Sequence, residues 1–316
     1  MVLSVLFPEP RLSCLYAQPK TSAINPVLSP PGVWFVNNRK MANWDDTSRA
    51  RIAHVQTQLR PLLCQAVPDS CRHLRGRGSV KGAVRSLHHA VNHARYVARF
   101  DIKSYYQSMH HDVLLSLLDS AGAHAYCRAV VADYLSLPDR RNTGRGMVAG
   151  GSLSPGLGAL YLAPLDRAMD RRQRAGTVVS YLRYMDDYVI LTKTRWQLRR
   201  AIADMHTVLE SLRLCVHRTK RFIGKTSHGF DFLGYQIHPG RAVRPSREAY
   251  RRLRLRSRRL YERGGDLNRL RQYLQRWWQW LHGGLDRLVC RKGGLQRLIR
   301  HILSHLHIPR PRCRDG

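Results

Sequence analysis

Acidic residues are scarce in this chain, and the shortage bears directly on what the protein binds. The 316 residues include 21 Asp plus Glu against 54 Lys plus Arg, so the formal net charge at pH 7 is +33. A field of this sign attracts polyanions and steers phosphate groups toward the protein. So large an excess favours a nucleic-acid partner over a basic surface that is merely solvated.

The chain also lacks the patterns of membrane proteins and disulfide-rich proteins. No apolar run is long enough to span a bilayer and no strongly amphipathic lipid-seeking helix stands out, so no membrane partner is expected. The apolar start has no basic residues before it and is broken by Pro8 and Pro10, unlike a signal peptide. The seven cysteines form no C-x-x-C pair. We therefore expect free thiols in a reducing cytoplasm rather than a zinc finger or a disulfide scaffold.

What is present divides the chain into three parts. Hydrophobic residues make up 43 %, which is ordinary for a folded globular protein. Residues 1–44 are predicted to form an irregular extension because prolines interrupt each short apolar piece, and Met41 is a candidate for the true start. Residues 45–240 mix helical and strand patterns. Residues 241–316 are dense in Arg, with Leu and Trp at helical spacing, and predict a separate small helical domain.

Local patterns predict the elements of the middle part. Residues 96–102 are apolar and β-prone, so we expect a strand that ends near Asp101. Two apolar runs flank Met185, Asp186 and Asp187 and predict a hairpin with its turn at the acidic pair. Helices are expected at about 46–63, with Asp46 or Thr47 as N-cap, and at about 112–118, 126–135, 155–172 and 196–212; short strands are expected near 214–217, 221–223 and 230–237.

Three aspartates are placed where paired strands would bring them together. Asp101 ends one predicted strand, and Asp186 and Asp187 lie in the predicted turn. Carboxylates that meet repel one another unless a cation neutralises them, and oxygen ligands suit Mg²⁺. Two such ions about 4 Å apart can activate a 3′-hydroxyl and stabilise a leaving pyrophosphate. Taken singly, each aspartate is explained as well by turn chemistry or a strand end; their combination and order favour templated phosphoryl transfer.

Five segments stand in the order of a known set of motifs. They are FDIKSYY at 100–106, GSLSP at 151–155 followed by ALYL at 159–162, YMDD at 184–187, Lys220, and FLGY at 232–235. This ordered set resembles motifs A to E of the reverse transcriptases, particularly the prokaryotic ones of group II introns, retrons, diversity-generating elements and defence systems. A lone YxDD box would be weak support, whereas five motifs in order are specific.

The resemblance implies a fold, a cofactor and partners. The fold would be α+β, a right-hand polymerase with fingers and palm (an antiparallel sheet plus helices) at 45–240 and a small basic helical thumb at 241–316. Two Mg²⁺ ions, with Mn²⁺ as a substitute, would be held by Asp101, Asp186, Asp187 and the backbone carbonyl of Ile102. The partners would be an RNA template, such as a dedicated non-coding RNA, a DNA or RNA primer, and dNTPs, in a prokaryotic cytoplasm.

Candidate nucleotide contacts lie on both sides of the first motif. Lys81 and Arg85 lie one helical turn apart and can grip a triphosphate, although a solvated basic face is the alternative. Lys220 is placed to give a proton to the leaving pyrophosphate. The resemblance makes Tyr106 a wall against the ribose 2′-hydroxyl and predicts dNTPs over rNTPs. If Tyr105 or Tyr106 faces inward instead, that ring is a core aromatic.

One segment departs from the family pattern. Val148-Ala149-Gly150 stands where motif B usually reads Pro-Gln-Gly, so the amide that contacts the nucleotide is missing. Gly150 and Gly151 still permit a close backbone approach to a nucleotide.

The fifth motif and the C-terminal part are expected to contact nucleic acid or to pack. Phe232, Leu233 and Gly234 are expected to grip the primer, as the resemblance implies. A very basic helix is suited to following a phosphate backbone; its arginines are Arg251, Arg252, Arg254, Arg256, Arg258 and Arg259. At least two of Trp277, Trp278 and Trp280 are expected in the core.

Three functions remain open at this point. The main hypothesis is an RNA-directed DNA polymerase of a retroelement or an antiviral defence system. A template-independent or protein-primed DNA polymerase of a defence system is the second, favoured by Ala149. The third is a catalytically idle, maturase-like RNA-binding protein, which would be indicated by loss of one metal-binding aspartate; all three are present.

Overall fold

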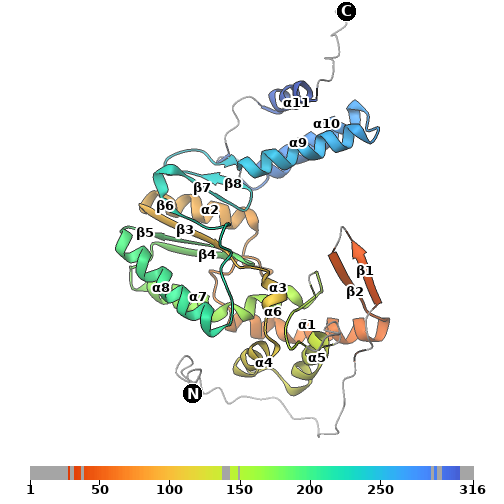
Figure 1. The fold of residues 1–316 in the computed structure, drawn as a ribbon, viewed down its shortest axis with the longest axis vertical. Coiled ribbons are helices and arrows are strands. Elements are labelled where there is room, and N and C mark those ends of the chain that lie inside the picture. Colours follow the sequence, from red (N-terminus) through yellow and green to blue (C-terminus); the bar gives the residue numbers. More distant parts are fainter. Residues whose placement is uncertain are drawn as a thin grey trace, which may run out of the picture.

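The computed structural model describes residues 28, 32–36, 39–136, 143–148, 150–285, 288–289 and 294–306, and these form a mixed α+β fold (Figure 1). A four-stranded antiparallel sheet lies among helices, and a helical C-terminal part extends from one end of it. The α+β fold expected from the sequence is confirmed. No helix in the described part is both long enough and apolar enough to cross a bilayer.

The central sheet has the strand order β4-β5-β3-β6. Its strands are β3 (Tyr96–Asp101), β4 (Ser180–Tyr184), β5 (Asp187–Thr192) and β6 (Phe222–Lys225). Every pair is antiparallel, and Asp101 lies opposite Asp187 in the register of β3 with β5. The predicted strand before Asp101 and the predicted hairpin around 185–187 are thereby confirmed.

Alternate residues of the sheet enter two different cores. Ala98, Phe100 and Ile190 pack in the larger core, which also receives α7 (Ala163–Arg174) and α8 (Arg195–Ser211). Val97 and Val189 pack in a second core with α2 (Val80–Ala90). Because successive side chains of a strand point to opposite faces, a sheet covered on both faces is apolar throughout.

Helices α1 (Asp46–Ala66), α4 (His111–Ser120) and α5 (Ala125–Ser136) complete the larger core. The N-cap expected at Asp46 or Thr47 is wrong by one residue. The side chain of Asp45 accepts the hydrogen bond from the Ser48 amide, which makes Asp45 the cap.

The single helix expected at 155–172 is two helices. They are α6 (Ser154–Tyr161) and α7, and Leu162 between them has a φ of −97° and a ψ of 3°. Pro164, in the first turn of α7, has no amide to donate, and its ring would clash with the carbonyl of Leu160 in a continuous helix. The second helix therefore begins with Pro164 in its first turn, where proline is favoured.

Part of the expected N-terminal irregular segment is ordered. Strands β1 (Gly32–Val36) and β2 (Arg39–Asn43) form an antiparallel hairpin, in which Trp34 pairs with Met41. The expectation of irregular structure over 1–44 is therefore wrong for this hairpin. The prolines of this segment all precede β1, so none of them interrupts the ladder. The rest of the expected extension lies outside the described residues, apart from Leu28 and Trp44.

Two of the short strands expected after α8 also differ. Residues 214–217 make only an isolated bridge, from Val216 to Ile102. Residues 230–237 form a hairpin of β7 (Phe230–Phe232) and β8 (Tyr235–Ile237), which β9 (Arg244–Pro245) extends. The turn is made by Leu233 and Gly234 with φ of 49° and 86°, a left-handed pair that reverses the chain.

The C-terminal part consists of α9 (Arg247–Glu262), α10 (Leu267–His282) and α11 (Gly294–His305). Its core is aliphatic and is made by Leu253, Leu270, Leu274, Leu298, Ile302 and Leu303. Trp277 and Trp278 pack against this core, whereas Trp280 is 42 % exposed. The expectation that at least two of these tryptophans are core residues is confirmed.

Candidate active site

Two of the three aspartates face one another across neighbouring strands. Asp101 ends β3, Asp187 begins β5, and the two are direct partners in the ladder. The amide of Ile102 donates to the carbonyl of Asp186 at 3.3 Å, so the third aspartate is tied to the same strand end. The amide of His217 donates to the Asp101 carbonyl at 2.8 Å and supports β3 from the other side.

The turn itself differs in detail from the expected one. It is made by Met185 and Asp186, and Asp187 is already a strand residue. Met185 has a φ of 57°, in the left-handed region that residues other than Gly and Asn rarely adopt. The sharp reversal places Asp186 at the tip and leaves Asp187 beside Asp101.

Burial and mutual repulsion raise the pKa values of the turn carboxylates. The pKa of Asp187 is raised to about 6, first by burial, and by Asp101 and Asp186, against the opposing effect of Arg99. Burial also raises the pKa of Asp186, and Asp101 adds to it. The Oδ1 atom of Asp187 is buried without a hydrogen-bond partner. A divalent cation would supply the missing partner and remove the repulsion.

The donor set fits a cation that arrives together with a substrate. Among the described residues, no three His, Cys, Asp or Glu side chains form a ready-made metal cage. Mg²⁺ in phosphoryl-transfer sites is commonly held by one or two carboxylates plus the phosphates of the substrate. The partnerless oxygen of Asp187, next to Asp101, suits that kind of site.

Lys220 lies beside these carboxylates. Its Nζ is 3.6 Å from Oδ1 of Asp101, and its side chain is 58 % exposed. The loop between α8 and β6 therefore brings the exposed Lys220 ammonium to the end of β3. The two residues are far apart in the sequence, so their contact comes from the fold.

The structure separates the roles of the two tyrosines after β3. Tyr105 is buried, and its hydroxyl donates to the carbonyl of Gly158. Tyr106 is only half-buried, and its pKa is raised to about 12 by burial and by the charge of Asp186. The core aromatic is thus Tyr105, whereas Tyr106 packs at the edge of the larger core, near enough to Asp186 for its charge to act on the phenol.

The glycines before α6 have different reasons to be glycine. Gly150 has a φ of 85°, which favours glycine. A Cβ at Gly151 would lie 1.8 Å from the hydroxyl of the buried Tyr134, so packing alone demands glycine there. Ala149, at the position of the missing amide, lies outside the described residues.

Lys81 and Arg85 are bound elsewhere than at the aspartates. The Lys81 ammonium donates to the Tyr235 hydroxyl and to the Trp280 carbonyl, and Arg85 donates to the carbonyl of Gly284. Burial lowers the pKa of Lys81 to about 8. Both cations bind carbonyls at the end of α10, where a helix leaves acceptors unpaired. The sequence pattern gave no sign of this partner.

The β7–β8 turn connects the sheet with the helical part. Arg99, two residues before Asp101, donates to the Asp231 carbonyl at 2.6 Å. The carbonyl of Gly234 accepts from the Ser246 amide at 2.9 Å, and Phe232 is buried. A Cβ at Gly234 would lie 3.4 Å from the Trp280 ring. The segment expected to grip a primer thus rests on both β3 and α10.

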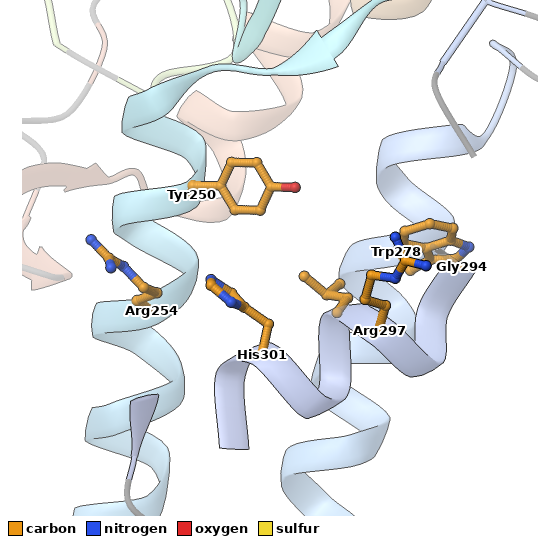
Figure 2. Close-up of a pocket in the computed structure, with 7 residues that line it drawn as sticks. Tyr250, Arg254, Trp278, Gly294, Arg297 and His301 are labelled. Atoms are coloured by element: carbon orange, nitrogen blue, oxygen red, sulfur yellow. The ribbon is translucent and has the colours of Figure 1, made fainter. Parts of the chain in front are cut away.

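Three of the six arginines of the predicted basic helix are paired locally, with two glutamates between them. Arg251 and Arg252 both bind Glu248, and Arg258 binds Glu262. Further along, a hollow of about 330 Å³ is lined by Arg256, Arg259, Leu260, Arg263 and Arg269. A second hollow of about 380 Å³ lies between α9, α10 and α11 (Figure 2). The described residues of both linings include arginines and no carboxylate, so both hollows suit phosphates.

The antiparallel sheet is covered by helices and carries aspartates at adjacent strand ends. This arrangement is that of the palm of a nucleic-acid polymerase, and the helical C-terminal part follows it in the chain. Residues 38–237 match the family described as reverse transcriptase (RNA-dependent DNA polymerase). The chain belongs to this family.

Two known proteins illustrate the relationship. Protein YkfC of Escherichia coli (strain K12) is 24 % identical over an alignment of 200 residues that covers 48 % of this chain and 52 % of YkfC. The chain thus spans about half the length of this curated relative. The structure of apo telomerase from Candida tropicalis is similar with a TM-score of 0.56 at 11 % identity, over 91 % of this chain and 61 % of that one. At that identity the likeness is one of fold.

Proposed function

We propose that the protein is an RNA-directed DNA polymerase that adds dNTPs to the 3′-hydroxyl of a primer. The observation that carries this proposal is the register of Asp101 against Asp187, with a buried, partnerless carboxylate oxygen at their junction. Membership in the reverse transcriptase family supports the same activity.

Each residue of the site has a proposed task. Two Mg²⁺ ions, with Mn²⁺ as a substitute, would be held by Asp101, Asp186, Asp187 and the Ile102 carbonyl. When bound, they would supply Lewis-acid chemistry for the attack of the primer hydroxyl and the departure of pyrophosphate. Lys220, 3.6 Å from Asp101, gives a proton to the leaving group.

The substrate contacts are proposed on either side of these carboxylates. Tyr106 closes the space beside the ribose, and Gly150 and Gly151 let the backbone approach the nucleotide. Phe232, Leu233 and Gly234 position the primer end. The local binding of Lys81 and Arg85 favours a role between α2 and α10 over a triphosphate contact.

The biological setting is proposed on a coarser basis. On the motif resemblance we propose a retroelement or antiviral defence protein of a prokaryotic cytoplasm, and similarity to a protein of Escherichia coli supports only the prokaryotic part. The net charge of +33 supports RNA template and primer as partners. Retention of all three aspartates disfavours an idle maturase-like protein, and Ala149 keeps a template-independent or protein-primed polymerase as the second candidate.

Primer extension on an RNA template tests the proposal. Asp186→Ala should lower dNTP incorporation by roughly 10³-fold or more, because it removes a metal ligand worth several kcal/mol of transition-state stabilisation. The control is Asp46→Asn, whose side chain is 96 % exposed in the first turn of α1. Asp186→Ala extending at the wild-type rate would refute the assignment. Incorporation that continues without any template would favour the second candidate.

A further inference from the structure

Both polar groups of the Met185 backbone are held by side chains. Its amide donates to Nδ1 of His73 at 3.0 Å, and its carbonyl accepts from Nη1 of Arg183 at 2.9 Å. Met185 has the left-handed φ of 57° and directly precedes Asp186. A non-glycine residue keeps such a conformation only where its surroundings over-determine it.

The hydrogen-bond partners of His73 determine its protonation state and tautomer. Its Nε2 lies 3.1 Å from the carbonyl of Pro155. A carbonyl can only accept and an amide can only donate, so His73 is neutral with its proton on Nε2. Burial and Arg183 lower its pKa to about 4, consistent with this state. His73 therefore joins the turn to the first residues of α6, just after the loop of Gly150 and Gly151.

Arg183 approaches the turn from a fully buried network. It and Asp166 both have 0 % exposed side chains, and Nε of Arg183 donates to Oδ1 of Asp166 at 2.7 Å. Its Nη2 also donates to the carbonyl of Ala159 in α6 at 3.1 Å, and the Tyr181 hydroxyl donates to Asp166 at 2.7 Å. A buried ion pair adds little stability over an apolar pair but defines one geometry, which suits a positioning role.

We propose that His73 and the Arg183–Asp166 pair are positioning residues that hold the Met185 turn, and with it the Asp186 carboxylate, at the distance from Asp101 that the reaction needs. Because both side chains also bind carbonyls of α6, they couple the turn to the loop that is proposed to meet the nucleotide. This inference rests on the proposed polymerase function.

The test first removes the two hydrogen bonds by which His73 holds the Met185 turn, called the clamp below. It then replaces Met185 with a residue that adopts the turn conformation without them. His73→Phe keeps a ring but loses both hydrogen bonds, so kcat should fall about tenfold and half-activation should need several-fold more Mg²⁺, with the KM for primer little changed. His73→Gln, which can both accept and donate, should regain part of the loss. Adding Met185→Gly to His73→Phe should also restore activity in part, because glycine adopts a positive φ without steric strain.

Hydrogen exchange gives a readout that does not depend on activity. The Met185 amide should be protected in the wild-type protein and exchange faster in His73→Phe, while the amides of β3 stay protected. Unchanged exchange and an unchanged Mg²⁺ requirement in His73→Phe would refute the clamp. So would a loss that Met185→Gly fails to restore. A wild-type protein that extends no primer while the exchange result holds would refute the polymerase assignment instead.

A second inference concerns the 380 Å³ hollow of the helical part. It is lined by Tyr250, Arg254, Trp278, Gly294, Arg297, Leu298 and His301. Figure 2 shows the rings of Tyr250 on α9 and His301 on α11 pointing into the space between these helices. Tyr250 is 38 % exposed, while Leu298 is buried as an apolar floor. The volume of the hollow lies in the range of about 300–1,000 Å³ that is usual for small-molecule sites.

Such a lining matches one unpaired nucleotide. Aromatic rings stack on a base, and arginines bind the adjacent phosphate or stack on the base themselves. A base inside a duplex has both faces covered and cannot enter. We infer that the hollow binds an unpaired base of a single-stranded RNA segment, apart from the polymerase centre. This rests on the proposed RNA partner, and the choice of a nucleic acid over a protein follows from the arginines of the lining, whose described residues include no carboxylate.

Binding experiments test this inference without catalysis. Tyr250→Leu and Arg297→Ala should each weaken the binding of a single-stranded oligoribonucleotide about tenfold, in line with the stacking of one base, and leave blunt duplex binding unchanged. Arg300→Ala, an exposed arginine of α11 outside the lining, is the matched control. An RNA carrying 4-thiouridine should crosslink to the peptide with Tyr250. Crosslinks confined elsewhere, or equal losses for duplex and single strand, would overturn the site.

Discussion

At the scale of single residues, Asp187 shows the conflict between function and stability. Its pKa is raised to about 6 from 3.8, mainly by burial. The folded protein therefore holds this proton more tightly than the unfolded chain does. The destabilisation is complete above pH 6 and vanishes below the unfolded value near 3.8. In the proposed function this carboxylate serves a metal ion, whereas its burial lowers the stability of the metal-free fold.

Asp187→Asn should consequently stabilise the metal-free protein while it abolishes polymerisation. We expect the free energy of unfolding at pH 8 to rise by roughly 2–3 kcal/mol, from a pKa difference of about two units. At pH 3.5 the effect should be close to zero. Urea unfolding in the presence of a chelator measures both values, and an equal effect at both pH values would contradict the assignment of the shift.

Tyr106 is the residue that should select the sugar. Tyr106→Val removes the ring that is proposed to close the space beside the ribose, so incorporation of rNTPs relative to dNTPs should rise about tenfold or more on one primer–template, since steric selection of this kind is worth about 1–3 kcal/mol. Tyr106→Phe keeps the ring and should keep the selection. Discrimination unchanged in Tyr106→Val would remove this role. A wild-type protein that already prefers rNTPs would refute the reverse-transcriptase activity.

At the scale of elements, α9 shows why charge counts in a sequence overstate a binding surface. Arg251 and Arg252 share Glu248, whose pKa they lower to about 2. By contrast, Arg259 and Arg263 line a hollow to which no described carboxylate contributes. Phosphate binding should therefore depend more on the C-terminal half of α9 than on its first turns.

The salt dependence of nucleic-acid binding checks this division. Replacing Arg259 and Arg263 with Ala should lower the slope of log K against log salt by roughly 0.9 for each phosphate that the protein no longer neutralises. The matched double variant at Arg251 and Arg252 should change the slope less, because Glu248 already neutralises one charge there. Equal slopes for both pairs would mean that the local ion pairs do not decide which arginines bind phosphate.

At the scale of the whole molecule, Lys81 links the palm to the helical C-terminal part. Its ammonium lies 4.9 Å from the Tyr235 ring and 4.7 Å from the Trp280 ring, as well as on the carbonyls at the end of α10. The β7–β8 turn, which is proposed to grip the primer, is thereby fastened to both parts. The relative placement of primer and helical part should depend on this one cation.

Lys81→Met separates this role from a triphosphate contact. We expect processivity on a long template to fall about fivefold, the equivalent of one hydrogen bond of about 1 kcal/mol, with the KM for dNTP unchanged. Lys193→Met, at an exposed lysine between β5 and α8, serves as a charge-matched control. A large rise in the KM for dNTP with unchanged processivity would restore the triphosphate role of Lys81.

Local sequence patterns were enough to predict the enzyme class and most elements of this protein. Short-range patterns sufficed for β3, the β4–β5 hairpin and the amphipathic helices, because periodicity and turn residues act within a few positions. The order of the motifs was enough to identify the family. The break at Pro164 was also open to prediction, since a proline inside a helical pattern ends it.

Which groups meet over long separations follows from the tertiary structure alone. The partners of His73, Arg183 and Lys81 lie 112, 17 and 199 residues away, at Met185, Asp166 and Trp280. Likewise Gly151 is a glycine because of Tyr134, and Tyr105 rather than Tyr106 enters the core. Side chains at such separations are brought together by packing and hydrogen-bond satisfaction in the folded core, which no local pattern encodes.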